Sequence, residues 1–426
     1  MTHTDLSGLL IGTATAAVQI EGGDTGNQWH AFAEQPGRIV DGSTPTPATD
    51  HWNRWREDTD LMAELGLQVY RLGLEWSRIE PQPDRIDETA VARYRDELTA
   101  VRAAGIRPLV TLHHFSHPIW FEERGGWAGP DAAETFVRHA RRMVDLFGDL
   151  VDEWVTINEP NVFATGGYLF GEFPPGRTNA WPQIRTVLYA MARGHCLAYR
   201  AIHEAQPHAR VGVAHHLRGF DPLNPRNPVH RLLARSNAYL FQGAITEAMF
   251  GGRFPAVLGP QPADVDPGSH YDFLGINYYT RTAVSRIDDG RFPDVPVNDL
   301  DWEIHPRGLI DVARWLHDRY PGPIWVTENG TADRDDAFRA RFIADHLSVM
   351  VDSGLPFERY YHWCFVDNWE WAEGHTAKFG IVDLDVATMQ RRVRRSGEFL
   401  SRAIAAGAIT EELRAEFLAD SRYRRG

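Results

Sequence analysis

Residues 69–115 carry the pattern that decides the fold: an apolar run, an amphipathic stretch and a second apolar run. The first run is VYRLGLEW (Val69–Trp76), the stretch is ETAVARYRDELTAVRAAG (Glu88–Gly105), and the second run is PLVTLHHF (Pro108–Phe115). Both runs suit strands, whereas the stretch between them has the helical period and stops at a glycine. This order predicts a right-handed βαβ unit in a parallel sheet.

The same alternation continues over the whole chain. Further strand-like runs are Leu9–Thr15, Trp154–Asn158, Arg210–His215, Phe273–Tyr279, Ile324–Glu328 and Tyr360–Val366. Further helical stretches are Trp52–Gly66, Asp131–Phe147, Gln183–Ala205, Val229–Phe250, Arg307–Tyr320, Asp335–Ser353 and Gln390–Ala405. Eight strands and eight helices predict an α/β protein, a (β/α)8 TIM barrel, as a single domain over residues 1–426. Residues 411–425 are predicted to add one C-terminal helix.

Composition excludes several classes of protein. The 426 residues include 44 Lys and Arg against 58 Asp and Glu, a net charge of −14, which argues against nucleic acid or an anionic membrane as a partner. No window of about 18 apolar residues predicts a membrane span, and the N-terminus lacks the basic start of a signal peptide. Two cysteines, Cys196 and Cys364, cannot form a disulfide framework and suit a reducing compartment. We therefore expect a cytoplasmic protein.

Aromatic residues are numerous, with 14 Trp, 13 Tyr and 21 Phe. They fit a large core, and they also fit a sugar-binding cleft in which flat rings stack on pyranose faces. Composition alone leaves both interpretations open.

Polar residues gather where the predicted strands end, which is where a TIM barrel places its active site. They are Gln19, Glu21, Arg71, Glu75, His113, His114, Asn158, Glu159, His215, His216, Asn277, Tyr279, Glu328, Asn329, Trp363, Asn368 and Glu370. Glu159 follows the apolar run WVTIN and Glu328 follows PIWVT, and an unpaired carboxylate behind a buried strand is costly. Each could pair with an arginine at the barrel rim. Together they also fit the two facing carboxyls that glycoside hydrolysis needs.

At these motifs the chain resembles the family 1 glycoside hydrolases, retaining β-glycosidases on a (β/α)8 barrel. The segment TINEP (Thr156–Pro160) resembles the family's acid/base motif, and VTENG (Val326–Gly330) resembles its nucleophile motif. The resemblance implies Glu159 as acid/base and Glu328 as nucleophile. It implies Arg71 and Tyr279 as residues that support the nucleophile. The implied sugar-binding residues are Gln19, His114, Asn158, Asn277, Tyr279, Trp363, Glu370 and Trp371.

The implied activity is an exo-acting, retaining β-glycosidase, with β-glucosides as the expected substrates. Its expected partner is a small-molecule glycoside or oligosaccharide, and no metal or cofactor is expected. A β-mannosidase or β-galactosidase of the same family, a catalytically silent sugar-binding barrel and a metal-dependent barrel hydrolase stay as alternatives.

The chain departs from the family pattern at a few positions. Phe115 stands where the family usually has Trp, which removes an indole N–H donor. His216 ends the fifth strand together with His215, and the pair fits either rim structure or substrate contact. The loop Arg281–Pro306, with Phe292 and Trp302, is predicted to shape the aglycone side.

The resemblance also sets an expectation for the two carboxyls. Arg71 and Tyr279 should lower the pKa of Glu328, so that the nucleophile is ionised. Burial and the charge of Glu328 should raise the pKa of Glu159, so that the acid holds its proton.

Overall fold

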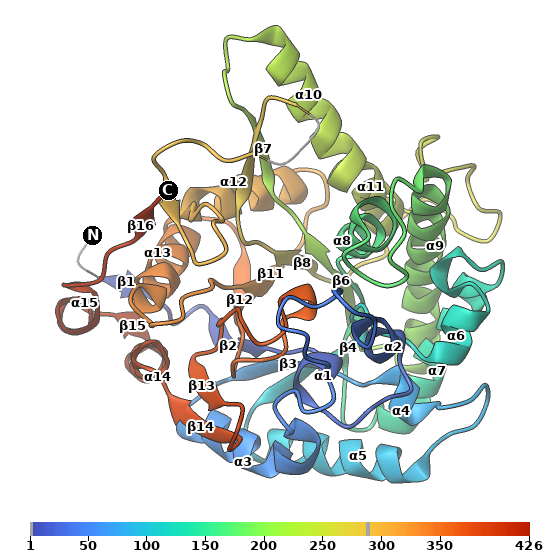
Figure 1. Cartoon of the computed structure of the whole chain (residues 1–426), viewed down its shortest axis with the longest axis horizontal. Coiled ribbons are helices and arrows are strands. Elements are labelled where there is room, and N and C mark those ends of the chain that lie inside the picture. The colour runs from blue at the N-terminus through green and yellow to red at the C-terminus, as the bar shows by residue number, and fades with distance from the viewer. Residues whose placement is uncertain (1–2, 287–289) are drawn as a thin grey trace.

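The computed structural model describes residues 3–286 and 290–426, and within them eight parallel strands close into a barrel ringed by helices (Figure 1). The strands follow the chain around the barrel in the order β2, β3, β4, β5, β6, β8, β11 and β12, and β12 pairs with β2. Their bounds are β2 Leu10–Ala14, β3 Val69–Gly73, β4 Arg107–His113, β5 Glu153–Asn158, β6 Arg210–His216, β8 Leu274–Asn277, β11 Ile324–Asn329 and β12 Phe357–Trp363. The prediction of a single-domain (β/α)8 barrel is confirmed, with each predicted strand in place.

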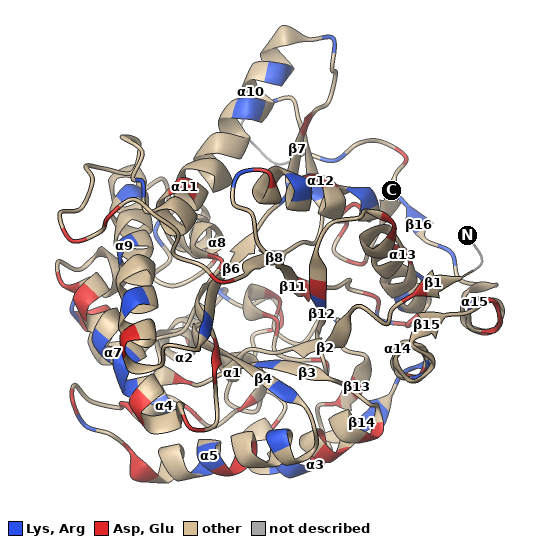
Figure 2. Cartoon of the chain, turned by 180° about the vertical axis from the view of Figure 1, so that it is seen from behind, with Lys and Arg blue, Asp and Glu red and all other residues tan. Residues whose placement is uncertain are grey.

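Helices cover the outside of the barrel. The long ones are α3 His51–Glu64, α5 Glu88–Ala103, α7 Ala132–Phe147, α9 Trp181–Ala205, α10 Pro228–Ala238, α12 Pro306–His317, α13 Arg339–Asp352 and α14 Arg395–Ala406. Shorter helices are α1 Ala17–Ile20, α2 Gln28–Ala33, α4 Trp76–Ile79, α6 Ile119–Glu123, η1 Gly126–Ala128, α8 Pro160–Thr165, η2 Gly166–Phe170, η3 Tyr239–Gly243, α11 Ala244–Gly251, η4 Trp371–Glu373 and α15 Glu411–Leu418. Viewed from behind, the outer helices carry interspersed charges of both signs (Figure 2).

The unit from β3 to β4 shows why these residues fold this way. Asp87 caps α5 by accepting hydrogen bonds from the backbone N–H groups of Thr89 and Ala90. Tyr94, Leu98 and Val101 recur at helical spacing and are buried. Gly105, with φ +80°, then turns the chain into β4.

Four short two-stranded sheets lie outside the barrel in the described part of the chain. They pair β1 Thr4–Asp5 with β15 Ala408–Ile409, β7 Gly219–Pro222 with β9 Arg281–Val284, β10 Pro296–Val297 with β16 Arg424–Arg425, and β13 Val382–Asp385 with β14 Gln390–Val393. The helix α10 projects from the barrel, and Ala234 is its buried residue (top of Figure 1).

Three predicted helices differ from the structure. The stretch Val229–Phe250 is divided into α10, the wider turn η3 and α11. Residues 390–393 form β14, because this segment pairs with β13 before α14 begins. The C-terminal helix expected over 411–425 covers Glu411–Leu418, and Arg424–Arg425 pair with β10. None of the described helices is both long enough and apolar enough to cross a membrane.

Candidate active site

Glu159 lies at the junction of β5 and α8. Its backbone takes a left-handed conformation, with φ +43°, and Pro160 starts α8 immediately after it. The backbone N–H of Glu159 donates to the carbonyl of Ala214 on the neighbouring strand β6 at 2.8 Å. The carboxyl is buried and receives two hydrogen bonds on the same oxygen, Oε1, from Asn277 Nδ2 at 2.7 Å and His216 Nδ1 at 3.2 Å.

Glu328 lies on β11, which is buried over its whole length. Arg71 Nη1 donates to Glu328 Oε1 at 2.6 Å, and the Tyr279 hydroxyl donates to Oε2 at 2.6 Å. His114 Nε2 is a further neighbour, 3.8 Å from Oε1. Each oxygen of this carboxyl therefore has its own strong donor.

One hydrogen-bond network connects the two carboxyls. The second guanidinium nitrogen of Arg71 donates to Asn158 Oδ1 at 2.7 Å, and Asn277 Nδ2 donates to the same oxygen at 3.0 Å. Asn277 also reaches Glu159, so the chain of contacts runs from Glu328 to Glu159 through three side chains. Strand pairing fixes this arrangement, because Asn277 is the register partner of Glu328 across β8 and β11.

Burial dominates the ionisation of Glu328. Desolvation raises its pKa to about 7 although Arg71 lowers it, and the negative charge of Glu159 adds to the rise. Burial also opposes ionisation of Glu159, but His216, Asn277 and Arg71 outweigh it and hold the pKa of Glu159 below its ordinary value. Both directions differ from those expected, because desolvation raises the pKa of Glu328 more than Arg71 and Tyr279 lower it.

A third carboxyl, Glu370, lies near the end of β12. Gln19 Nε2 donates to Glu370 Oε2 at 3.3 Å, and the Trp363 indole donates to the same oxygen at 3.4 Å. Burial raises the pKa of Glu370 to about 8, in spite of the Trp363 hydrogen bond, and the charge of Glu328 adds to the rise. The residues of this group come from opposite ends of the chain and meet only when the barrel closes.

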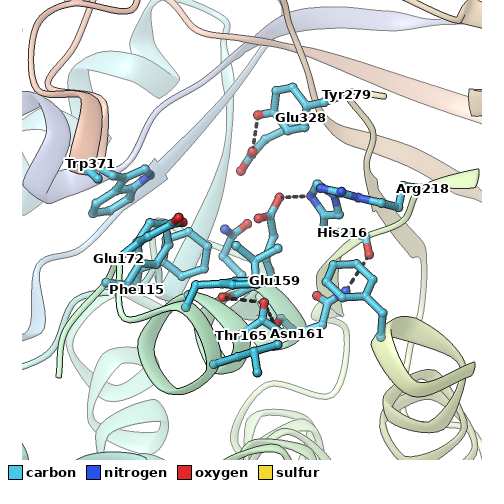
Figure 3. A pocket seen from close by; sticks show the side chains of 18 of the residues that line it. Phe115, Glu159, Asn161, Thr165, Glu172, His216, Arg218, Tyr279, Glu328 and Trp371 are labelled. Atoms are coloured by element: carbon cyan, nitrogen blue, oxygen red, sulfur yellow. Dashed lines mark hydrogen bonds and ion pairs between the residues drawn. The ribbon is translucent and has the colours of Figure 1, made fainter. Parts of the chain in front are cut away.

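The carboxyls open into a cavity of about 510 Å3 (Figure 3). Of the predicted site residues, its lining includes His114, Asn158, Glu159, Tyr279, Glu328, Trp363, Glu370 and Trp371. Gln19, Arg71 and Asn277 are not among the lining residues, but they hydrogen-bond to Glu370, Asn158 and Glu159, which are. Figure 3 shows the two carboxyls turned into the same space, with Trp371 on one side and His216 on the other.

Other strand-end candidates do not join the cavity. Glu21 pairs with Arg78, and Glu75 accepts hydrogen bonds from Ser77 and Ser116. His113 lies beside the Trp127 indole. Within the described residues, no group of three or more His, Cys, Asp or Glu is arranged to hold a metal ion.

The structure separates the two histidines that the sequence left open. His216 lines the cavity and bonds Glu159, whereas His215 bonds Thr246 behind it. Of the loop 281–306, Trp302 lines the cavity, Phe292 lies against the Arg281 guanidinium, and residues 287–289 are outside the described part.

The sequence analysis did not identify the apolar part of the lining that η2, α9 and η3 contribute. It includes Leu169, Phe170, Trp181, Ile184, Leu240 and Phe241. No motif marks these side chains, because they come from helices that are distant in the chain.

Comparison with known proteins shows the family of the chain. The family model for glycosyl hydrolase family 1 matches residues 3–408. The chain belongs to glycosyl hydrolase family 1. This family 1 enzyme is 29% identical to beta-glucosidase A of Thermotoga maritima, over 95% of the chain and 98% of the relative. It is 31% identical to a beta-glucosidase of Agrobacterium sp., over 93% and 94%. It is 28% identical to a beta-galactosidase of Pyrococcus woesei, over 96% and 98%.

Solved structures extend the similarity. The beta-glucosidase of Thermotoga maritima in complex with glucoimidazole superimposes with a TM-score of 0.87 at 28% identity, covering 94% of this chain and 98% of that one. The AHE enzyme of Alicyclobacillus herbarius does so with a TM-score of 0.87 at 33% identity and the same coverage. The family 1 enzyme is thus a glycosyl hydrolase on a TIM barrel, with its two buried carboxyls at strand ends.

Proposed function

We propose that this family 1 enzyme is a retaining exo-β-glycosidase that hydrolyses terminal β-D-glycosides, with β-glucosides as its main substrates. Glu328 is the nucleophile, and Glu159 is the acid and then the base of a double displacement. The observation that carries the proposal is the pair of buried carboxyls that share one hydrogen-bond network and open into one cavity.

The hydrogen bonds support this division of roles. Arg71 and Tyr279 each hold one oxygen of Glu328, which suits a group that must be a carboxylate when it attacks. Among the described residues, both donors to Glu159 reach Oε1. The other oxygen, Oε2, is then the one that carries the proton toward the glycosidic oxygen.

Buried polar atoms support a sugar on the Glu370 side of the cavity. Within the described residues, Asn158 Nδ2 and His114 Nδ1 have no hydrogen-bond partner, and both side chains line the cavity. Asn158 Oδ1 is occupied by Arg71 and Asn277, so its amide nitrogen is free to meet a ring hydroxyl. Together with Gln19, Trp363, Glu370 and Trp371 these groups form the glycone subsite.

The names of the relatives favour glucose as the sugar. Two of the three relatives named above are beta-glucosidases and one is a beta-galactosidase. We therefore expect β-glucosides to be the best substrates and β-galactosides to be secondary ones. We further propose a cytoplasmic location, which the sequence predicts and the two buried free cysteines suit.

Rescue with azide tests the roles of the two carboxyls. Glu328→Ala should lose nearly all turnover of a nitrophenyl β-glucoside, and azide should restore it by forming the α-glucosyl azide, because azide attacks from the face that the carboxylate used. Glu159→Ala should instead give the β-azide with an activated leaving group. A β-azide from Glu328→Ala would reverse the roles. Absence of turnover by the wild-type enzyme on gluco-, galacto- and mannosides alike would favour the silent sugar-binding barrel. Loss of wild-type turnover in EDTA would favour a metal-dependent hydrolase.

A further inference from the structure

The chain segments that line the cavity differ in chemistry. The segment from Trp363 to Glu373 contributes polar groups and indoles, whereas η2, the start of α9 and η3 contribute mainly aliphatic and aromatic side chains. This apolar part of the lining, here called the outer lobe, consists of Leu169, Phe170, Trp181, Ile184, Leu240 and Phe241. These side chains come from η2, the first turns of α9 and η3.

Chain connectivity places the outer lobe on the leaving-group side. Glu159 leads directly into α8, and α8 continues into η2, which carries Leu169 and Phe170. On the other side of the carboxyl, His216 bonds Glu159, and its ring lies 5.9 Å from the ring of Phe241. The group that receives the proton of Glu159 therefore faces the outer lobe, and the sugar faces Glu370.

Large apolar side chains stand exposed around this lobe. Phe170 is 57% exposed, Trp181 58% and Leu240 55%, although each lines the same cavity. Solvent-exposed apolar groups that gather at one mouth mark a binding surface, because a ligand that covers them removes them from water.

The same lobe offers few hydrogen-bond partners to the hydroxyls of an oligosaccharide. A second sugar ring would need donors and acceptors along its hydroxyls, and the aliphatic side chains of Leu169, Ile184 and Leu240 supply neither. The polar lining residues on this side include Arg218, Asn237 and Glu172. Arg218 Nε already donates to His216 Nε2 at 3.3 Å.

We propose that the outer lobe binds a large apolar aglycone, so that the preferred substrates are β-glycosides of long-chain or fused-ring alcohols and not cello-oligosaccharides. The inference rests on the proposed function, because the role of Glu159 as proton donor makes the outer lobe the leaving-group side.

A series of alkyl β-glucosides tests the proposal on the wild-type enzyme. We would measure kcat/KM for methyl, butyl, hexyl and octyl β-glucoside below their micelle concentrations, and for cellobiose. Full burial of a methylene corresponds to about a fourfold gain, so partial burial predicts about twofold per methylene and roughly a 100-fold gain from methyl to octyl. Octyl glucoside should also exceed cellobiose.

Two leucines of similar exposure provide a matched pair of variants. Leu240 lines the outer lobe, whereas Leu232 is 65% exposed on the projecting helix α10 and is not part of the lining. Leu240→Ser should lower the octyl-to-methyl ratio by about three- to tenfold, and Leu232→Ser should leave it at the wild-type value. Because both side chains are exposed, neither change removes a core contact.

The outcomes separate this inference from the proposed function. Three results would contradict the proposal of an apolar aglycone without contradicting β-glucosidase activity. They are an octyl-to-methyl ratio of kcat/KM below about three, a higher kcat/KM for cellobiose than for octyl glucoside, and equal effects of Leu240→Ser and Leu232→Ser on the ratio. Failure to hydrolyse any of these glucosides, nitrophenyl glucoside included, would overturn the proposed function itself.

Discussion

His216 Nδ1 lies 3.2 Å from Glu159 Oε1, and on the other side of the ring Arg218 Nε donates to His216 Nε2 at 3.3 Å. Arginine has no lone pair to offer, so Nε2 must accept and the proton of the neutral ring must sit on Nδ1. His216 is thereby a fixed donor to Oε1 of Glu159. Asn277 donates to the same oxygen, so the proposed role of Glu159 as the acid assigns the transferred proton to its other oxygen, Oε2.

Removal of this donor should impair proton donation specifically. His216→Leu should lower kcat/KM for glucosides with poor leaving groups by about 10- to 100-fold, the value of a hydrogen bond to a charged group of 1.5–3 kcal/mol. Turnover of dinitrophenyl glucoside, which needs no proton, should fall much less. His216→Asn should recover most of the loss, because its amide can donate from a similar position.

The neighbouring histidine provides the control for that experiment. His215→Asn alters a side chain that bonds Thr246, outside the cavity lining. It should leave the dependence on the leaving group as in the wild type. Equal losses on good and poor leaving groups in His216→Leu would show that His216 supports the fold and does not position Glu159.

The pH profile of kcat/KM should be bell-shaped with its basic limb near pH 7. At a pH below this limb, Glu159 and Glu328 together hold one proton, and burial raises the pKa of Glu328 to about 7. At a pH above the limb, the pair has lost this proton, and the acid has none to donate to the leaving group. Addition of a second proton at low pH leaves both carboxyls neutral, so no carboxylate remains to attack the sugar, and this gives the acidic limb. The measurement is kcat/KM for nitrophenyl glucoside between pH 4 and 9.

The variant Glu159→Gln tests which carboxyl gives each limb of the pH profile. With dinitrophenyl glucoside the variant should lose its basic limb, because no proton is needed. Its acidic limb should report Glu328 alone, and it should lie below pH 7 because the negative charge of Glu159 no longer raises that pKa. A basic limb that persists near pH 7 would assign it to another group.

Phe115 should affect the preference of the enzyme for glucosides over mannosides. It lines the cavity, is buried, and packs against Trp371 and Phe173 with ring centroids 5.2 and 5.4 Å apart. Phe115→Trp adds one N–H donor, which is worth roughly 0.5–1.5 kcal/mol, so the glucoside-to-mannoside ratio of kcat/KM should rise about two- to twelvefold. An unchanged ratio in a variant with wild-type thermal stability would show that this side chain does not face the sugar.

A buried ion cluster that is not part of the cavity lining should make stability depend on pH. His51 Nδ1 lies 2.7 Å from Asp58, and its Nε2 lies 2.8 Å from Glu97. Burial favours neutral His51, but the two carboxylates outweigh it and raise the pKa of His51 from 6.5 to about 9. A raised histidine pKa gives stability that is complete below pH 6.5 and is lost as the pH rises through 9.

Unfolding in urea at pH 6 and pH 9.5 measures this effect. The free energy of unfolding of the wild type should fall between these values by about 3 kcal/mol more than that of His51→Gln, since one pKa unit corresponds to 1.36 kcal/mol. The variant should also be less stable at pH 6, because among the described residues Asp58 keeps only Arg391 and Glu97 keeps only Arg93 as a cationic partner. An equal decrease in the free energy of unfolding of both proteins between pH 6 and pH 9.5 would show that the charge of His51 does not contribute to stability.

The local sequence determined the barrel and its two principal carboxyls. Strand-forming runs and helical stretches alternate, so each βαβ unit can be identified from residues close together in the chain, as at Val69–Phe115. Glu159 and Glu328 also stood out locally, because each is a charge that directly follows an apolar run. The prediction was wrong where a segment's state depends on a remote partner, as at 390–393, which pairs with β13.

Only the closed barrel determines which residues contact the two carboxyls and how their pKa values shift. Arg71 meets Glu328 across 257 positions of sequence, and Gln19 meets Glu370 across 351. The pKa values of Glu159 and Glu328 depend on their burial and on all neighbouring charges. Neither can be derived from the sequence motifs, because both depend on the folded structure. The outer lobe likewise exists only where η2, α9 and η3 come together, because an apolar surface formed by several helices has no sequence pattern of its own.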